Sequence, residues 1–247
     1  MSTSPEHRDA AGWAPPVQTL TVADGHINVT GRRPTAPIHG FGRMWQKTYR
    51  ICFGDITVAP TDVIAVWKER FSEFWPPKSK FFAPLAGIAP GEVAALDLGM
   101  PGGLKLSTGV LVLFADEESF TLMTPQGHMF AGWITFSAFT EDGQTHAQAQ
   151  VLMRASDPLY EIGMIFGGHR QEDKHWEHTL RSLAAHFGAA GEVTVQRVCV
   201  DRRREWSHVG NVRHNSGIRS GLYMFGTPFR AIPRRKAKTL SPTDGED

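Results

Sequence analysis

The stretch THAQAQVLMRASDP, residues 145–158, decides how this sequence folds. Its odd positions are apolar over nine residues: Ala147, Ala149, Val151, Met153 and Ala155. Most of the positions between them are polar: His146, Gln148, Gln150 and Arg154. Successive side chains of a strand point to opposite faces, so the pattern predicts a strand with one buried and one solvated face.

A long helix is expected to follow this strand and to run to Gly188. Asp157 suits the N-cap, Pro158 the first helical position, and Gly188 the C-terminal stop. The apolar residues of this segment fall on one helical stripe: Ile162, Ile165, Phe166, Trp176, Leu180, Leu183 and Phe187. The pair Gly167-Gly168 predicts a soft spot in the middle of the helix.

Upstream of the stretch, short runs of β-forming residues are separated by Gly, Pro and acidic turns. These runs predict strands over residues 92–98, 104–115, 119–124 and 129–139. The short connections favour antiparallel neighbours, because a parallel pair needs a long crossover. The predicted class is therefore α+β, with a curved antiparallel sheet and a long C-terminal helix packed across it.

The chain before residue 92 predicts three further segments. Residues 45–53 alternate like a strand, and a helix is expected from Thr61 or Asp62 to the stop at Pro76. Residues 78–92 mix aromatics with Pro and Gly, which indicates a short helix or a bent loop.

Three regions are expected along the chain: a loosely ordered arm (1–42), the folded domain (43–190) and a basic extension (191–247). The extension begins with a possible strand over 193–200. Between Arg197 and Lys238 it carries eleven basic and two acidic side chains, so it could bind an anionic lipid surface, nucleic-acid phosphates or a protein partner. Its aromatic residues indicate that it folds back on the domain or docks onto a partner: Trp206, Tyr223, Phe225 and Phe229.

Several classes of protein are not supported by the sequence. It contains no apolar run of the roughly 18 residues that a transmembrane segment needs, and residues 1–16 lack a signal-peptide core, so we expect a cytoplasmic protein. Cys52 and Cys199 are too few for a disulfide framework and are expected to be buried thiols. No phosphate-binding loop, dinucleotide fingerprint, zinc motif or nucleophile elbow is present, so no cofactor or metal is expected.

The element order and two phrases carry a resemblance to a known superfamily. ITVAPTDVIAVW (56–67) is similar to a first strand that passes into a first helix, and TPQGHMFAGWI (124–134) resembles a Gly-His turn. Residues 43–188 resemble the helix-grip fold of the START-like superfamily, also called the polyketide cyclase and lipid-transport (SRPBCC) superfamily. The Gly-His phrase resembles an uncharacterised bacterial branch of it.

The resemblance implies an elongated cavity between the sheet and the terminal helix that binds an apolar small molecule such as a lipid or a polyketide. Ten bulky side chains are candidates to line this cavity: Trp67, Phe71, Phe81, Phe82, Met123, Phe130, Trp133, Phe136, Met153 and Trp176. Two alternatives stay open, a cyclase or dehydratase type of enzyme and an interaction module that acts through the basic extension. The oligomeric state is left open.

Two histidines are candidate general acid–base groups for the enzymatic alternative. His128 lies in the Gly127-His128 turn, and His169 lies seven residues before Trp176 on the apolar stripe. Glu172 and His175 have the spacing of a helical metal pair, but no second such pair exists. We therefore expect these two residues to belong to a solvated polar face.

Overall fold

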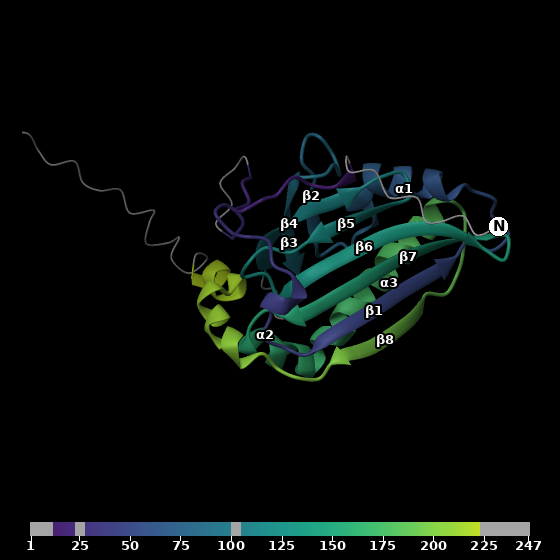
Figure 1. The fold of residues 1–247 in the computed structure, drawn as a ribbon. Helices are drawn as coiled ribbons and strands as arrows, with labels where there is room; N and C mark the ends of the chain where they lie inside the picture. The colour runs from purple at the N-terminus through teal and green to yellow at the C-terminus, as the bar shows by residue number, and fades with distance from the viewer. Residues whose placement is uncertain (1–11, 23–27, 100–104, 223–247) are drawn as a thin grey trace, which may run out of the picture.

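The computed structural model describes residues 12–22, 28–99 and 105–222, in which helices pack on one face of a large sheet (Figure 1). The strands are β1 (Met44–Cys52), β2 (Lys80–Phe82), β3 (Val93–Gly99), β4 (Lys105–Ala115), β5 (Ser119–Met123), β6 (Phe130–Glu141), β7 (Gln144–Ala155) and β8 (Thr194–Asp201). The helices are α1 (Pro60–Glu69), α2 (Pro158–Gly163) and α3 (His169–His186), with a π-helical turn η5 (Met164–Gly168) and the 3-10 helices η2 (Pro37–His39), η3 (Phe71–Phe74) and η6 (Trp206–His214). Within the described ranges, no helix is long and apolar enough to cross a membrane.

The sheet has the order β2-β3-β4-β5-β6-β7-β1-β8, and every neighbouring pair is antiparallel. Short connections account for the antiparallel pairing. In the hairpin of β6 and β7, for example, the strands are joined by a tight turn in which Asp142 and Gly143 both adopt positive φ. Its register runs from Phe130 opposite Ala155 to Glu141 opposite Gln144. The large antiparallel sheet with a terminal helix across it confirms the predicted α+β helix-grip fold.

The core lies between the inner face of the sheet and the helices α1 and α3 (Figure 1). The predicted alternation in β7 holds, because Ala147, Ala149, Val151 and Met153 are buried while the residues between them are half-exposed. Leu180 and Leu183 of α3 close over this face, and both are fully buried. Burial of apolar surface at about 25 cal/mol per Å² makes this contact the main source of stability.

The C-terminal helix is broken where the Gly pair predicted a soft spot. Phe166 and Gly167 have non-helical backbone angles, and Gly167 has a φ of 116° that favours glycine. The expectation of one continuous apolar stripe was therefore wrong before the break. Ile162 and Ile165 are 51% and 60% exposed, because the break changes the direction in which the side chains of α2 and η5 point.

Residues 78–92 contain a strand, which the sequence did not indicate. The three residues of β2 pair with β3, with Phe81 opposite Leu96. The expectation of a short helix or a bent loop was wrong at these positions, because three residues are too few to show a period of two. The rest of the segment is turn and loop.

The chain outside residues 43–190 also contacts the sheet. Leu20 and Val29 form a small second cluster with Leu111 on the outer face. The possible strand at the start of the basic extension is β8, which pairs with β1. Cys52 and Cys199 are half-buried and not fully buried as expected, because Cys199 lies in the exposed edge strand β8 and Cys52 is the last residue of β1, beyond the pairing with β8. The division into three regions stays a prediction.

A buried charge cluster fastens α3 to β1. Lys47 is 1% exposed, and its Nζ lies 2.7 Å from Glu172 Oε2 and 2.9 Å from Asp173 Oδ1. Tyr49 donates a 2.7 Å hydrogen bond to Asp173, and Arg197 of β8 contacts the same carboxylate at 2.9 Å.

Glu172 therefore does not lie on a solvated polar face as expected, because it meets a buried lysine of the sheet that the sequence spacing cannot reveal. Burial raises the pKa of Glu172. Burial would also raise the pKa of Asp173, but hydrogen bonds from Tyr49 and Lys47 outweigh it and lower this pKa. The cluster thus holds Asp173 as the stronger acid of the two.

Replacing Lys47 tests how much the cluster contributes to stability. The substitution Lys47→Met leaves the buried Glu172 without its cation, while Asp173 keeps Arg197 and Tyr49, and breaking a buried pair costs about 3–5 kcal/mol in comparable sites. We expect urea unfolding to show a loss of this size. Lys80→Met, which removes an exposed lysine from β2, should change the free energy of unfolding by less than about 0.5 kcal/mol. Equal stability of the two variants would contradict this role of the cluster.

Candidate functional site

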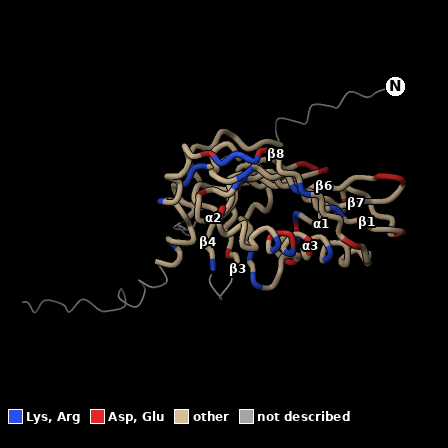
Figure 2. Tube along the Cα trace, turned by 90° about the horizontal axis from the view of Figure 1, so that it is seen from below, with Lys and Arg blue, Asp and Glu red and all other residues tan. Residues whose placement is uncertain are grey.

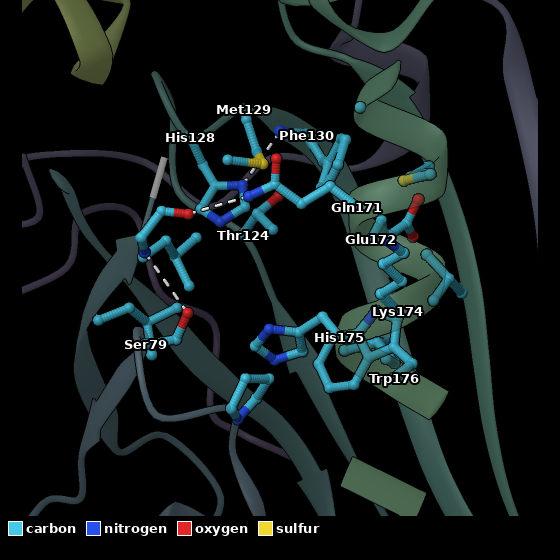
Figure 3. Close-up of a pocket in the computed structure, with 18 of the residues that line it drawn as sticks. Ser79, Thr124, His128, Met129, Phe130, Gln171, Glu172, Lys174, His175 and Trp176 are labelled. Carbon is cyan, nitrogen blue, oxygen red and sulfur yellow. Dashed lines mark hydrogen bonds between the residues drawn. The ribbon is translucent and has the colours of Figure 1, made fainter. Parts of the chain in front are cut away.

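A cavity of about 820 Å³ lies between the inner face of the sheet and the segment from α2 to α3 (Figure 3). Its volume is within the range of roughly 300–1,000 Å³ that is usual for small-molecule sites. The apolar side chains that form its sheet wall are Leu96, Leu98, Val110, Leu122, Phe130, Ile134, Val151 and Met153. The cavity thus lies on the same face of the sheet as the core, between the core and the solvent.

The opposite wall comes from the broken helix. Tyr160 and Met164 contribute from α2 and η5, and Phe166, which is 85% exposed, stands at the rim. In α3 the cavity is lined at three- and four-residue steps, by Gln171, Lys174, His175 and His178. The break at Gly167 is part of this wall, since Gly167 and Gly168 themselves border the cavity and have no side chains to fill it.

His128 lines the cavity from the turn between β5 and β6. It is 5% exposed, and burial lowers its pKa to about 4. Its Nδ1 accepts a 3.0 Å hydrogen bond from the backbone N–H of Phe130. A neutral imidazole carries one proton, so the proton is on Nε2. His128 therefore offers a hydrogen-bond donor to a ligand and has no free lone pair for a general base.

His175 lines the cavity from α3, across the space from His128 (Figure 3). Its ring packs on Trp75 at 4.8 Å and on Trp176 at 4.7 Å between ring centres. Burial lowers its pKa to about 4, so the ring is neutral at pH 7. Its Nε2 is buried and has no hydrogen-bond partner among the residues that the structure places.

His169, the second candidate acid–base residue, does not line the cavity. Its ring packs on Trp45 at 4.9 Å between centres, beside the charge cluster of Lys47. Burial and the charge of Lys47 lower its pKa to about 4. His169 and Trp176 both lie in α3, but they are two turns apart, and the ring of His169 packs against Trp45 of β1 whereas Trp176 borders the cavity.

Four of the ten residues that were candidates to contact a ligand line the cavity: Phe130, Trp133, Met153 and Trp176. Trp133 lies in β6 between Gly132 and Ile134. These two neighbours are on the side of the strand that faces the cavity. Strand alternation puts its indole on the outer face, so its main chain borders the space. A ligand contact of these residues stays a prediction.

The other six candidates lie away from the cavity. Trp67 and Phe71 pack on Phe136 at 5.0 and 5.1 Å between ring centres, and Phe81 packs on Phe71 at 4.8 Å. These four rings fill the core under α1 instead of enclosing free space. Phe82 is 49% exposed, and Met123 packs against the small cluster on the outer face.

The sequence reasoning missed the residues at the open edge of the cavity. These residues are Trp75, Lys78, Lys174 and His178. The four-residue step from Lys174 to His178 was visible in the sequence, but it also fits a solvated helix face. No sequence signal brings the loop of Trp75 and Lys78 beside α3, because that contact is tertiary.

The described part of the basic extension packs against residues next to the cavity. The backbone N–H of Gly217 donates to the Tyr160 hydroxyl at 2.9 Å, and that of Ser216 donates to the carbonyl of Gly127 at 2.9 Å. Asn215 donates to the carboxylate of Asp157, which also caps α2. The extension thus folds back on the domain as far as residue 222. Tyr223, Phe225, Phe229 and the basic residues up to Lys238 lie outside the described residues.

A metal site is not evident in the described part of the chain, which contains no cluster of three or more His, Cys, Asp or Glu side chains suited to a metal ion. Glu172 and His175, the pair with metal-ligand spacing, face different partners. Glu172 is bound by Lys47, whereas His175 packs between tryptophans.

No protein-family model matches the chain, and no curated protein matches it. A START superfamily protein from Mycobacterium smegmatis is 16% identical over 60% of this chain and 98% of its own, with a TM-score of 0.41. Ara h 8.0201 is 11% identical over 58% and 97%, with a TM-score of 0.43. The di-domain ARO/CYC StfQ from the steffimycin biosynthetic pathway is 10% identical over 58% and 50%, with a TM-score of 0.45. These likenesses concern the fold and leave the ligand open.

The fold and the site together define the class. The element order, the antiparallel sheet and the helix that closes over it are those of a helix-grip fold. The cavity lies where the resemblance in the sequence implied it, between the sheet and the terminal helix.

The buried state of His128 predicts a pH dependence of stability. The folded protein keeps His128 neutral down to about pH 4, whereas the unfolded chain takes up a proton near the usual pKa of 6.5. Stability should therefore be full above about pH 6.5 and fall as the pH decreases toward 4, by about 3 kcal/mol from this residue. Chemical unfolding of wild type and His128→Gln at several pH values isolates the effect, and His178→Gln is the exposed control. The difference in the free energy of unfolding between wild type and H128Q should shrink as the pH is lowered. A difference that stays constant with pH would contradict the role of His128 in the pH dependence.

Proposed function

We propose that the protein binds an apolar small molecule, such as a lipid, a polyketide or a related metabolite, in the cavity between the sheet and α2–α3. The observation that carries the proposal is the cavity itself, which is open to solvent, about 820 Å³ in volume and lined mainly by apolar side chains. An open apolar space of this size is costly in water unless a ligand fills it. A cytoplasmic location stays part of the proposal.

The polar groups of the cavity support a ligand that also carries oxygen atoms. His128 presents an N–H from one wall, and the neutral ring of His175 faces the space from another. A few such groups in an apolar pocket fix the orientation of a ligand. A ligand with a carbonyl or hydroxyl group beside His128 fits this arrangement.

An enzyme of the cyclase or dehydratase type is the second candidate, and one observation favours it. The N–H of the buried His128 lies in an apolar cavity. A hydrogen bond from this N–H to a ligand carbonyl would polarise the carbonyl more strongly there than in water. The role of His128 would be that of a donor and not of a base. His169 has no place in this mechanism, because it does not line the cavity.

Native mass spectrometry of the freshly purified protein tests the proposal most directly. We expect a companion of small mass that is released on denaturation and dissolves in organic solvent. A protein of bare mass that also fails to bind a neutral apolar dye such as Nile red would contradict the proposal.

A variant that fills the cavity separates binding inside it from binding to the surface. Val151 is 5% exposed and lines the cavity, so Val151→Trp should occupy the space that a ligand needs. We expect saturable Nile red fluorescence with wild type and a loss of at least tenfold in affinity with V151W. Val198→Trp, at a 44% exposed position of β8, should bind like wild type. Similar circular dichroism spectra would verify that both variants are folded.

A further inference from the structure

The mouth of the cavity carries two lysines. Lys78 and Lys174 both line the cavity, and both are exposed. In the part of the chain that the structure describes, neither forms an ion pair with a carboxylate. The mouth is therefore an apolar opening with unneutralised positive charge.

A chain of contacts places the two lysines at the same rim. The Cα of Gly99 lies so close to Lys78 that an added Cβ would stand 2.7 Å from the carbonyl oxygen of Lys78. The carbonyl of Gly99 accepts a 3.0 Å hydrogen bond from Gln171 Nε2 (Figure 3). Lys174 follows Gln171 by three residues in α3, so it lies one turn further along the same face.

The contact between Trp75 and His175 joins the same two segments a second time. Their ring centres are 4.8 Å apart, with Trp75 three residues before Lys78 and His175 next to Lys174. His178 lines the cavity one turn later in α3. The loop of residues 75–79 and the face of α3 thus form one edge of the opening, and Figure 2 shows Lys and Arg residues near β3 and a mixture of basic and acidic residues on α3.

The acidic side chains do not offset this charge. Among the described residues that line the cavity, Glu172 is the one acid, and it is buried and bound to Lys47. An exposed carboxylate that could pair with Lys78 or Lys174 is thus missing from the described lining. Charges of one sign around an apolar opening attract ligands of the opposite sign and orient them as they enter.

We infer that the ligand is an amphipathic anion, an apolar molecule that ends in a carboxylate, with its apolar part inside the cavity and its carboxylate between Lys78 and Lys174. The inference rests on the proposed binding of an apolar molecule and adds the class and orientation of the ligand. The carboxylate stays hydrated at the rim, so its burial costs little, and the two ammonium groups supply the attraction. The apolar wall of the sheet takes up the rest of the molecule.

The test compares two probes that differ only at the polar end, dodecanoate and dodecan-1-ol. Both are titrated by calorimetry at pH 8, where the acid is ionised, and below the concentrations at which they aggregate. Three proteins are compared: wild type, Lys78→Gln/Lys174→Gln, and the control Lys80→Gln/Lys105→Gln. The control removes the same charge from exposed lysines of β2 and β4 that do not line the cavity.

We expect K78Q/K174Q to bind dodecanoate about tenfold more weakly than wild type, equivalent to about 1.4 kcal/mol, and to bind dodecan-1-ol unchanged. The affinity of wild type for dodecanoate should also fall as salt is raised, because exposed charges are screened. K80Q/K105Q should bind both probes like wild type.

Two failures are distinguishable. If wild type binds the alcohol but K78Q/K174Q keeps the same ratio of acid to alcohol affinity as wild type, the two lysines do not select an anion and the inference is wrong, while the proposed function stands. An equal loss in K80Q/K105Q would likewise overturn it, because general charge and not contact would then account for the effect. If wild type binds neither probe, the proposed function fails with it.

Discussion

Lys47 holds Glu172 and Asp173 against β1, and this ionic contact sets the orientation of α3 on the sheet. A helix whose residues 172 and 173 face the sheet must present residues 171, 174, 175 and 178 to the side, since these positions follow the helical period. That side is the cavity. A shift of α3 by one residue would break both contacts of the buried Lys47 and the hydrogen bond from Tyr49 to Asp173.

The same helix explains why the cavity exists at all. Beyond Leu180 the apolar residues of α3 fill the core, whereas the break at Gly167 changes the direction of the chain between α2 and α3. The two helices have separate anchors. α3 is bound to β1 by the charge cluster, and α2 is bound to the C-terminal segment through Asp157 and Tyr160. The space between these anchors is wider than one helix with a single stripe would leave.

The sequence predicts the fold well because most of its elements carry a local signal. The period of two in β7 and the caps at Asp157 and Gly188 follow from residue types that act within a few positions. β2 escaped prediction because three residues show no period. The cavity residues were harder to predict, since a bulky ring can fill space as easily as border it, and Trp67 and Phe136 pack on each other. Lys78 is brought to the site by tertiary contacts, its own with Gly99 and that of Trp75 with His175, which no local pattern encodes.

The two edges of the sheet have a consequence for self-association. An unpaired strand edge invites another chain to pair with it, and β1, with its buried Tyr49 and Ile51, would be a long edge of that kind. β8 covers this edge, but the side chain of Arg197 is turned to Asp173 of α3, and Val198 and Val200 are 44% and 52% exposed. At the other end the sheet stops at β2, which offers three residues only. Edge-to-edge growth is thus limited at β2 by the shortness of the strand, whereas β8, with eight residues, is the edge that could pair with another chain.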